Sequence, residues 1–386
     1  MPDPTPAPNQ FKWVSIDLPD QYSYMRSAVY DNARDCVWVV SRENDGYASD
    51  RMVATLTRIN VADRSTVKMP LRLNADDYDV GLIALDAEDI LWMAWGKTLT
   101  RFDPDAGVAK QWTLPPYSGL ARVYSNDGRI DAMTISSDGE IWVAAGMLSA
   151  VFGFNPRSGT WDRPINLPFV SVEGPTSLAA PAPGIITING IALHGGAIDP
   201  QDSPRFAVIK TDTRSVKILS LSVDKYVATG SGQIVYFDRA GSLVRYDVIR
   251  ATSMMIGPAP LQWGRIAIMA VDLEGNVWLG ATIHGFAGVS KLDPLTGAIT
   301  QFQFPVVLRG YKPAPSPNPC SFHCYPVTCK PIIDLNCIPV VQSVGPDIQG
   351  MAPDAHGNLW MVTSSSSLGN SGDRFAFGPV VELETS

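Results

Sequence analysis

The sequence predicts an all-β protein, a seven-bladed β-propeller, from three features of its 386 residues. The first is a repeated hairpin, in which an apolar strand, a polar turn rich in Asp, Gly or Asn and a second strand opening on Trp follow one another. It occurs at residues 31–38, 86–92, 136–142, 272–278 and 354–360. The second is the repeat spacing of about 40–50 residues, which is typical of propeller blades. The third is the content of 32 Gly and 31 Pro, which suits many short strands joined by turns.

The two ends of the chain predict how the ring closes. Residues 1–10 read as a flexible, Pro-rich leader, and residues 11–386 as a single propeller domain. Residues 11–18 alternate like the strands that close other repeats, whereas the C-terminal repeat supplies only three strands, at 348–353, 359–363 and 375–383. We therefore expect residues 11–18 to complete the last blade, which removes the exposed edges of an open ring.

The blades follow in order along the chain. The first is expected to have strands at 28–30, 37–41, 54–60 and 66–70, and the second and third to span 79–115 and 129–168. The next two lack the Trp, with strands at 184–188, 206–211 and 216–221, and at 226–229, 233–237, 242–247 and 253–256. If these two are one blade, the ring has six blades. The sixth blade spans 264–305, and residues 306–343 form a Cys- and Pro-rich insertion before the last blade.

The bulk composition excludes two classes of protein. The formal charge is −8 and the isoelectric point is near 5.0, which argues against a general nucleic-acid binder, because such a protein needs a basic face. The sequence has no run of eighteen apolar residues, so no membrane span is expected.

The cysteines point to the compartment. Cys320, Cys324, Cys329 and Cys337 cluster in the insertion and favour two disulfides in an oxidising environment, with all three pairings open. Zinc is the alternative, but the spacing fits no common zinc motif. We therefore expect an extracellular or cell-surface location, although the given sequence has no signal peptide. Cys36 is expected to be a small core residue.

Two segments carry a family resemblance. Met133-Thr-Ile-Ser-Ser-Asp-Gly-Glu-Ile-Trp142, and the segment 289–302 with its closing Phe-Pro, resemble the streptogramin B lyase (virginiamycin B lyase) group of seven-bladed propellers, and more distantly gluconolactonase-like propellers. The resemblance covers five of the seven blades. It implies catalytic His residues eleven positions before blade Trp residues, and a Glu shortly after a Trp that helps to hold a metal. The corresponding positions here are Gly81, Asp131, Ala267 and Gln349, so the lyase activity is not transferred.

Polar residues near the starts of the innermost strands form the candidate site. Together with Trp95 they would line a funnel that takes a small anionic or polyhydroxylated ligand. The residues are Arg26, Arg129, Asp131, Arg265, Asp347 and Gln349. The alternative is that the Arg and Asp side chains pair with one another and fill a polar channel. His284 and Asp131 are the weak candidates for a catalytic role. No cofactor is expected, with Ca²⁺ or Mg²⁺ on the axis as the alternative.

Two functions remain open. The first is an extracellular binding or interaction protein, part of a cell-surface or self-associating assembly, whose insertion contacts another protein or identical copies. The apolar residues of the insertion favour it, because a solvent-facing lid would not need them. The second is a metal-assisted lyase or lactonase-type hydrolase with a rearranged site in the funnel and the insertion as its lid.

Overall fold

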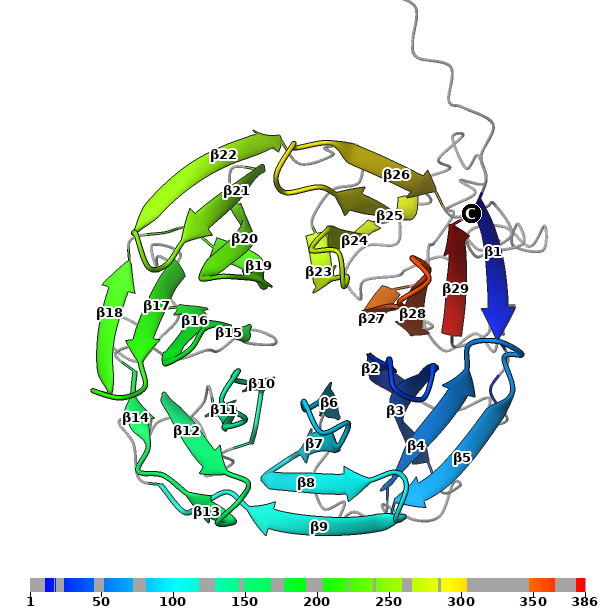
Figure 1. Cartoon of the computed structure of the whole chain (residues 1–386), viewed down its shortest axis with the longest axis horizontal. Coiled ribbons are helices and arrows are strands. Elements are labelled where there is room, and N and C mark those ends of the chain that lie inside the picture. The colour runs from blue at the N-terminus through cyan, green and yellow to red at the C-terminus, as the bar shows by residue number, and fades with distance from the viewer. Residues whose placement is uncertain are drawn as a thin grey trace, which may run out of the picture.

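The protein is described by a computed structural model, shown in Figure 1. The structure describes residues 11–16, 18, 24–44, 52–71, 81–117, 129–145, 149–167, 177–191, 204–219, 221, 223–238, 241–258, 266–283, 286–303, 347–364 and 380–385. The predicted insertion at 306–343, with Cys320, Cys324, Cys329 and Cys337, lies outside them.

Seven antiparallel sheets stand around a common axis, so the prediction of a seven-bladed β-propeller is confirmed (Figure 1). In blades one to six the strands follow one another outward from the innermost strand in sequence order. Blade one is β2 (Tyr24–Asp31), β3 (Cys36–Asn44), β4 (Met52–Asn60) and β5 (Thr66–Leu71). Blade two is β6 (Leu82–Leu85), β7 (Leu91–Trp95), β8 (Thr98–Asp103) and β9 (Val108–Thr113). Blade three is β10 (Ala132–Ile135), β11 (Ile141–Ala145), β12 (Ala150–Asn155), β13 (Thr160–Trp161) and β14 (Ile165–Asn166).

The two blades without Trp are separate, which excludes the six-bladed alternative. Blade four is β15 (Leu178–Ala182), β16 (Ile185–Ile191), β17 (Pro204–Lys210) and β18 (Ser215–Leu219). Blade five is β19 (Val223–Gly230), β20 (Gln233–Asp238), β21 (Ser242–Asp247) and β22 (Thr252–Pro258). Blade six is β23 (Ile266–Val271), β24 (Val277–Ile283), β25 (Phe286–Leu292) and β26 (Ile299–Gln303).

The N-terminal strand closes the ring, as the sequence predicts. Blade seven consists of β27 (Asp347–Pro353), β28 (Leu359–Ser364) and β29 (Val380–Thr385), with β1 (Phe11–Ile16) as its outermost strand. β1 pairs antiparallel with β29 from Phe11 opposite Thr385 to Ile16 opposite Val380. The first and last parts of the chain are thereby held side by side (Figure 1).

Apolar side chains pack between neighbouring blades rather than around one centre. The five repeat tryptophans, Trp38, Trp92, Trp142, Trp278 and Trp360, are at most 1% exposed. The second strand of a blade is buried on both faces, because each face meets an adjacent blade; β7 and β11 are buried at every position. Cys36 is fully buried, and burial raises the pKa of its thiol to about 11, so the expectation that it is a core residue is confirmed.

The described part of the chain contains no helix, and therefore none that is long and apolar enough to cross a membrane. The described turns lie mostly at one end of the ring, where the first and second strands of each blade join and where the third and fourth strands join. The predicted funnel belongs to the opposite end, where the innermost strands begin.

Candidate functional site

The axial end of blade three brings two predicted site residues together. Arg129 and Asp131 precede β10, and the Arg129 Nε donates to the Asp131 Oδ1 at 3.1 Å. The Arg129 side chain is 45% exposed and that of Asp131 is 13% exposed. The Asp131 backbone N–H donates to the Ala144 carbonyl at 2.8 Å, which fixes the carboxylate at the start of the blade. This pair matches the expectation that charged residues near the axis neutralise one another.

The axial end of blade two is filled by packing. A Cβ on Gly81 would lie 2.4 Å from the Val40 Cγ1 and 2.6 Å from the Trp95 Cζ3, so no side chain fits there. Trp95, which the sequence places among the ligand contacts, is 3% exposed and packs in the core between blades one and two. Little of its ring is left for a ligand to touch.

The remaining funnel candidates are only partly described. Gln349 lies in β27 and is half-buried. Arg26 and Asp347 lie in β2 and β27, but the structure does not describe their side chains. Arg265 and His284 lie outside the described residues. Whether these residues join the Arg129–Asp131 pair in one site therefore stays a prediction.

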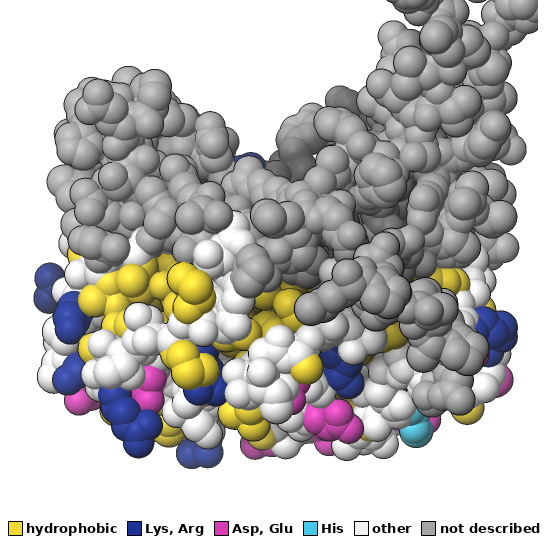
Figure 2. All heavy atoms as spheres, turned by 90° about the horizontal axis from the view of Figure 1, so that it is seen from above, with side chains coloured by type: hydrophobic (Ala, Val, Ile, Leu, Met, Phe, Trp, Pro, Cys, Tyr) yellow, Lys and Arg dark blue, Asp and Glu magenta, His cyan; other side chains and the backbone are white. Residues whose placement is uncertain are grey.

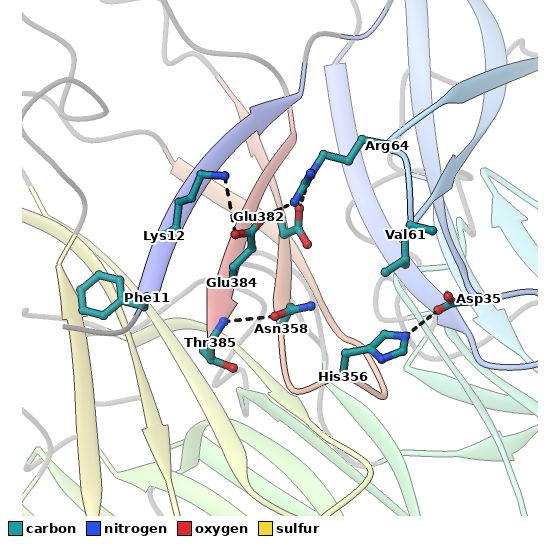
Figure 3. A pocket seen from close by; sticks show the side chains of 11 residues that line it. Phe11, Lys12, Asp35, Val61, Arg64, His356, Asn358, Glu382, Glu384 and Thr385 are labelled. Carbon is teal, nitrogen blue, oxygen red and sulfur yellow. Dashed lines mark hydrogen bonds and ion pairs between the residues drawn. The ribbon is translucent and has the colours of Figure 1, made fainter.

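A groove at the junction of blades seven and one is a second candidate, and the sequence did not reveal it (Figure 3). Its volume is about 630 Å³. It is lined by Phe11, Lys12, Asp35, Val61, Ala62, Arg64, His356, Asn358, Glu382, Glu384 and Thr385. These residues come from both ends of the chain, and ring closure alone brings them together.

The groove contains a network of ion pairs. The Arg64 Nε donates to the Glu382 Oε2 at 2.7 Å, and the same guanidinium contacts Glu384. Glu382 is 1% exposed, and burial raises the pKa of its carboxyl although Arg64 opposes this shift. Lys12 reaches Glu384 at 3.7 Å. These mutually paired charges hold blade one against blade seven (Figure 3).

The far side of the groove is built from two hairpin turns. The His356 Nε2 lies 3.1 Å from the Asp35 Oδ1, and the Tyr30 hydroxyl donates to the same oxygen at 2.9 Å. Burial and the neighbouring Asp35 raise the pKa of Tyr30, so the hydroxyl stays protonated and keeps donating. The groove thus offers paired charges and hydrogen-bonding groups to a polar ligand. The side chains that line it include neither an unpaired nucleophile nor a set of metal ligands.

An acidic cluster on blade three has an altered proton affinity. Burial, together with the nearby Asp162 and Asp138, raises the pKa of Glu140 to about 7. Such a carboxyl can exchange a proton near neutral pH. Within the searched residues, no three His, Cys, Asp or Glu side chains are placed so that they could hold a metal ion.

Searches against known protein families and against curated proteins find no match. Solved structures do match. A streptogramin B lyase aligns over 97% of this chain and 98% of its own, with 10% identity and a TM-score of 0.63. A catalytically inactive virginiamycin B lyase from Staphylococcus aureus, solved with quinupristin, aligns over 97% and 99%, with 10% identity and a TM-score of 0.61. The WD40 propeller domain of Doa1 aligns over 96% and 94%, with 9% identity and a TM-score of 0.53.

The chain has the fold of the streptogramin B lyase propellers. The resemblance noted in the sequence is thereby confirmed at the level of structure. Identities near 10% establish the shape and nothing about chemistry, and the match to a WD40 domain shows that the shape is not confined to lyases. The function has to be argued from the residues themselves.

Proposed function

We propose that this chain is a binding protein of the cell surface or the extracellular space, which holds another protein on its propeller and turns over no substrate at its axis. The proposal rests on what occupies the axial positions where the resemblance would place catalytic histidines. One is Gly81, where Val40 and Trp95 occupy the space of a side chain. Another is Asp131, which is paired with Arg129.

These two positions disfavour lyase chemistry for a physical reason. A general base needs a titratable side chain within hydrogen-bonding reach of the substrate. Gly81 has none, and a larger residue there would displace the core between blades one and two. The Asp131 carboxylate accepts a hydrogen bond from the Arg129 guanidinium, so this oxygen is already engaged within the protein. The extracellular location is supported by the four clustered cysteines in the sequence.

Turnover is the first test. The purified chain is incubated with quinupristin, with and without Mg²⁺ or Ca²⁺, and the products are followed by mass spectrometry. We expect no conversion. Conversion that Asp131→Asn abolishes, and that the matched exposed-turn variant Asp212→Asn retains, would establish an enzyme and refute the proposal.

Partner binding is the second test. The immobilised chain is expected to retain a protein from a surface extract of the cells that produce it. The retained protein is identified and purified, and the complex is reconstituted in a calorimeter. Saturable binding of a defined protein supports the proposal, and retention of none by the wild-type chain counts against it.

A further inference from the structure

The outer rim of the ring changes character at blades five and six. Four outermost strands carry a lysine near the middle, and an edge lysine discourages pairing with another strand. These residues are Lys68 in β5, Lys110 in β9, Lys217 in β18 and Lys12 in β1. The outer strand of blade three is instead divided into β13 and β14, with Pro164 between them. β22 and β26 have no lysine, are not divided and contain no charged residue; the only irregularity of β22 in its pairing with β21 lies at Ile256, close to its end at Pro258.

Large apolar side chains are exposed in the same sector. Met254 and Met255 of β22 are 45% and 68% exposed. Leu273 and Leu295, in the two turns of blade six, are 70% and 77% exposed, and Ile249 in a turn of blade five is 63% exposed. Blades two and three have small or polar residues at the turn positions equivalent to the two leucines, namely Ala87, Asp105, Ser137 and Arg157.

Several of these residues belong to one continuous surface. The Arg245 Nη2 contacts the Met254 Sδ at 3.6 Å, and its Nη1 donates to the Pro294 carbonyl at 3.1 Å. A Cβ on Gly297 would lie 3.3 Å from the Ile256 Cγ2. The turn that carries Leu295 is therefore seated directly on β22. Figure 2 views this side of the ring and shows hydrophobic side chains gathered on the rim.

We propose that the rim formed by Met254, Met255 and Leu295 is the contact surface between two copies of this chain, related by a two-fold axis with the β22 strands alongside each other. A two-fold contact is self-complementary, so residues near the axis meet their own symmetry mates. A lysine on β22 would then face a lysine, which is unfavourable. A different protein with an acidic strand would instead pair better with an edge that carries a lysine, as the edges of blades one, two, four and seven do. Because β22 has no charged residue, it can lie beside its own symmetry mate without charge repulsion, and we therefore infer a second copy as the partner.

This inference rests on the proposed interaction role, and it names a second copy of the chain as one partner. Exposed apolar side chains that occur singly need no such explanation, and Val67 and Val108, in blades one and two, are of that kind. Val67 directly precedes Lys68 in β5, and Val108 lies two positions before Lys110 in β9. They supply a matched comparison for the test.

The test is the molar mass in solution, measured by light scattering and sedimentation over a range of protein concentrations. The wild-type chain is expected at twice its mass of 41.7 kDa. Met255→Lys, which gives β22 the lysine of the other edges, is expected to weaken association at least about tenfold and to give a 41.7 kDa species. Val108→Lys, at a position 58% exposed on β9, is expected to leave the dimer intact.

Two results would overturn the inference. One is a wild-type chain of 41.7 kDa at every concentration, and the other is a Met255→Lys chain that remains fully dimeric. Circular dichroism verifies that the variant is folded, and Leu295→Lys, in a turn, replaces it if it is not. Neither result affects the tests with quinupristin or with a heterologous protein partner, so failure of the dimer and failure of the proposed function are distinguishable.

Discussion

A hydrogen bond between a turn aspartate and the blade tryptophan recurs in four of the five repeat hairpins. The Trp Nε1–H donates to the carboxylate in the pairs Trp38–Asp31, Trp92–Asp86, Trp278–Asp272 and Trp360–Asp354, at 2.8–3.3 Å. The same carboxylate accepts backbone N–H groups of its own turn, as Asp272 does from Asn276. The repeat is visible in the sequence but does not by itself reveal this role of the aspartate; the signal is the spacing between Asp and Trp, which is six residues in three of the pairs and seven in Asp31–Trp38.

Replacement of Asp272 by Ala should lower the free energy of unfolding by about 2 kcal/mol. The change leaves the buried Trp278 N–H without an acceptor and removes the nearer of the two carboxylates that pair with Lys291, which lies 3.0 Å away. Chemical denaturation measures the effect. Asp63→Ala is the control, because the Asp63 carboxylate accepts a hydrogen bond in an exposed turn, and it should leave the transition nearly unchanged.

Blade three departs from this pattern at two linked positions. Ser136 stands where the other turns have Asp, and the buried Trp142 Nε1 finds no hydrogen-bond partner among the described residues. Gly153 lies opposite Trp142, where Arg58, Arg101 and Lys291 lie opposite the tryptophans of blades one, two and six. Blade three therefore lacks both the turn carboxylate and the basic side chain that lie next to the tryptophan in those blades. A Cβ on Gly153 would lie 3.2 Å from the Glu140 Oε1, so the acidic side chain occupies the space beside this glycine.

The pKa of Glu140, raised to about 7 from an ordinary 4.5, predicts a dependence of stability on pH. Between these values Glu140 holds more protons in the folded chain than in the unfolded chain, so its contribution to stability is greatest below pH 4.5 and falls as the pH rises through 7. Since Glu140 is partly solvated, we expect the loss between pH 5 and 8 to be about 1 kcal/mol. Thermal unfolding at both pH values measures it. Glu140→Gln should remove this dependence of stability on pH. A variant whose stability still falls as steeply between pH 5 and 8 would contradict the assignment to Glu140.

At the scale of elements, the strands that the sequence missed lack the side chains that mark a blade. β15 (Leu178–Ala182) is the innermost strand of blade four; the turn that follows it has no Asp and the next strand, β16, has no Trp, so only the outer three strands of that blade were predicted. The outer strand of blade three is divided into β13 and β14 at Pro164, because proline cannot donate a ladder hydrogen bond. Trp95 was expected to face a ligand, and packing between blades one and two buries it instead.

Arg64 joins blade one to blade seven, and its replacement by Ala should cost about 3 kcal/mol of stability at neutral pH. The buried Glu382 would lose the guanidinium that lies 2.7 Å away. Burial already raises the pKa of Glu382, and without Arg64 the pKa rises further. Protonation then relieves the charge, so the difference between wild type and variant should shrink as the pH falls. Urea unfolding at two pH values measures this difference.

Lys12→Ala is the matched control for Arg64→Ala. Lys12 reaches the same network at 3.7 Å with a side chain that is 69% exposed, so its loss should change stability very little at either pH. Equal effects of the two substitutions would contradict the role assigned to buried Glu382.

For the molecule as a whole, the repeat made the fold predictable and ring closure limited what could be predicted of the site. Blade number, blade order and the closing strand follow from short local patterns, each within about one repeat. The groove at the closure joins Lys12 and Arg64 to Glu382 and Glu384, which are more than 300 residues away in sequence. No local pattern connects them. The predicted pairing of residues 11–18 with the last blade does indicate that the two ends of the chain meet, and it therefore gives the location of this junction.

Removal of residues 1–16 should open the ring. β29 would lose its partner β1 along six paired positions, Phe11 and Trp13 would no longer cover the core between blades six and seven, and the buried side chain of Ile16 would leave the core between blades seven and one. An exposed β29 edge also favours association with other strands. We expect a lower melting temperature, a broader transition and partial aggregation, and we expect a peptide of residues 11–18 added in trans to reverse part of the loss. A reversed-sequence peptide is the control. A truncated chain that melts like the full chain would mean that inter-blade packing alone holds the ring closed.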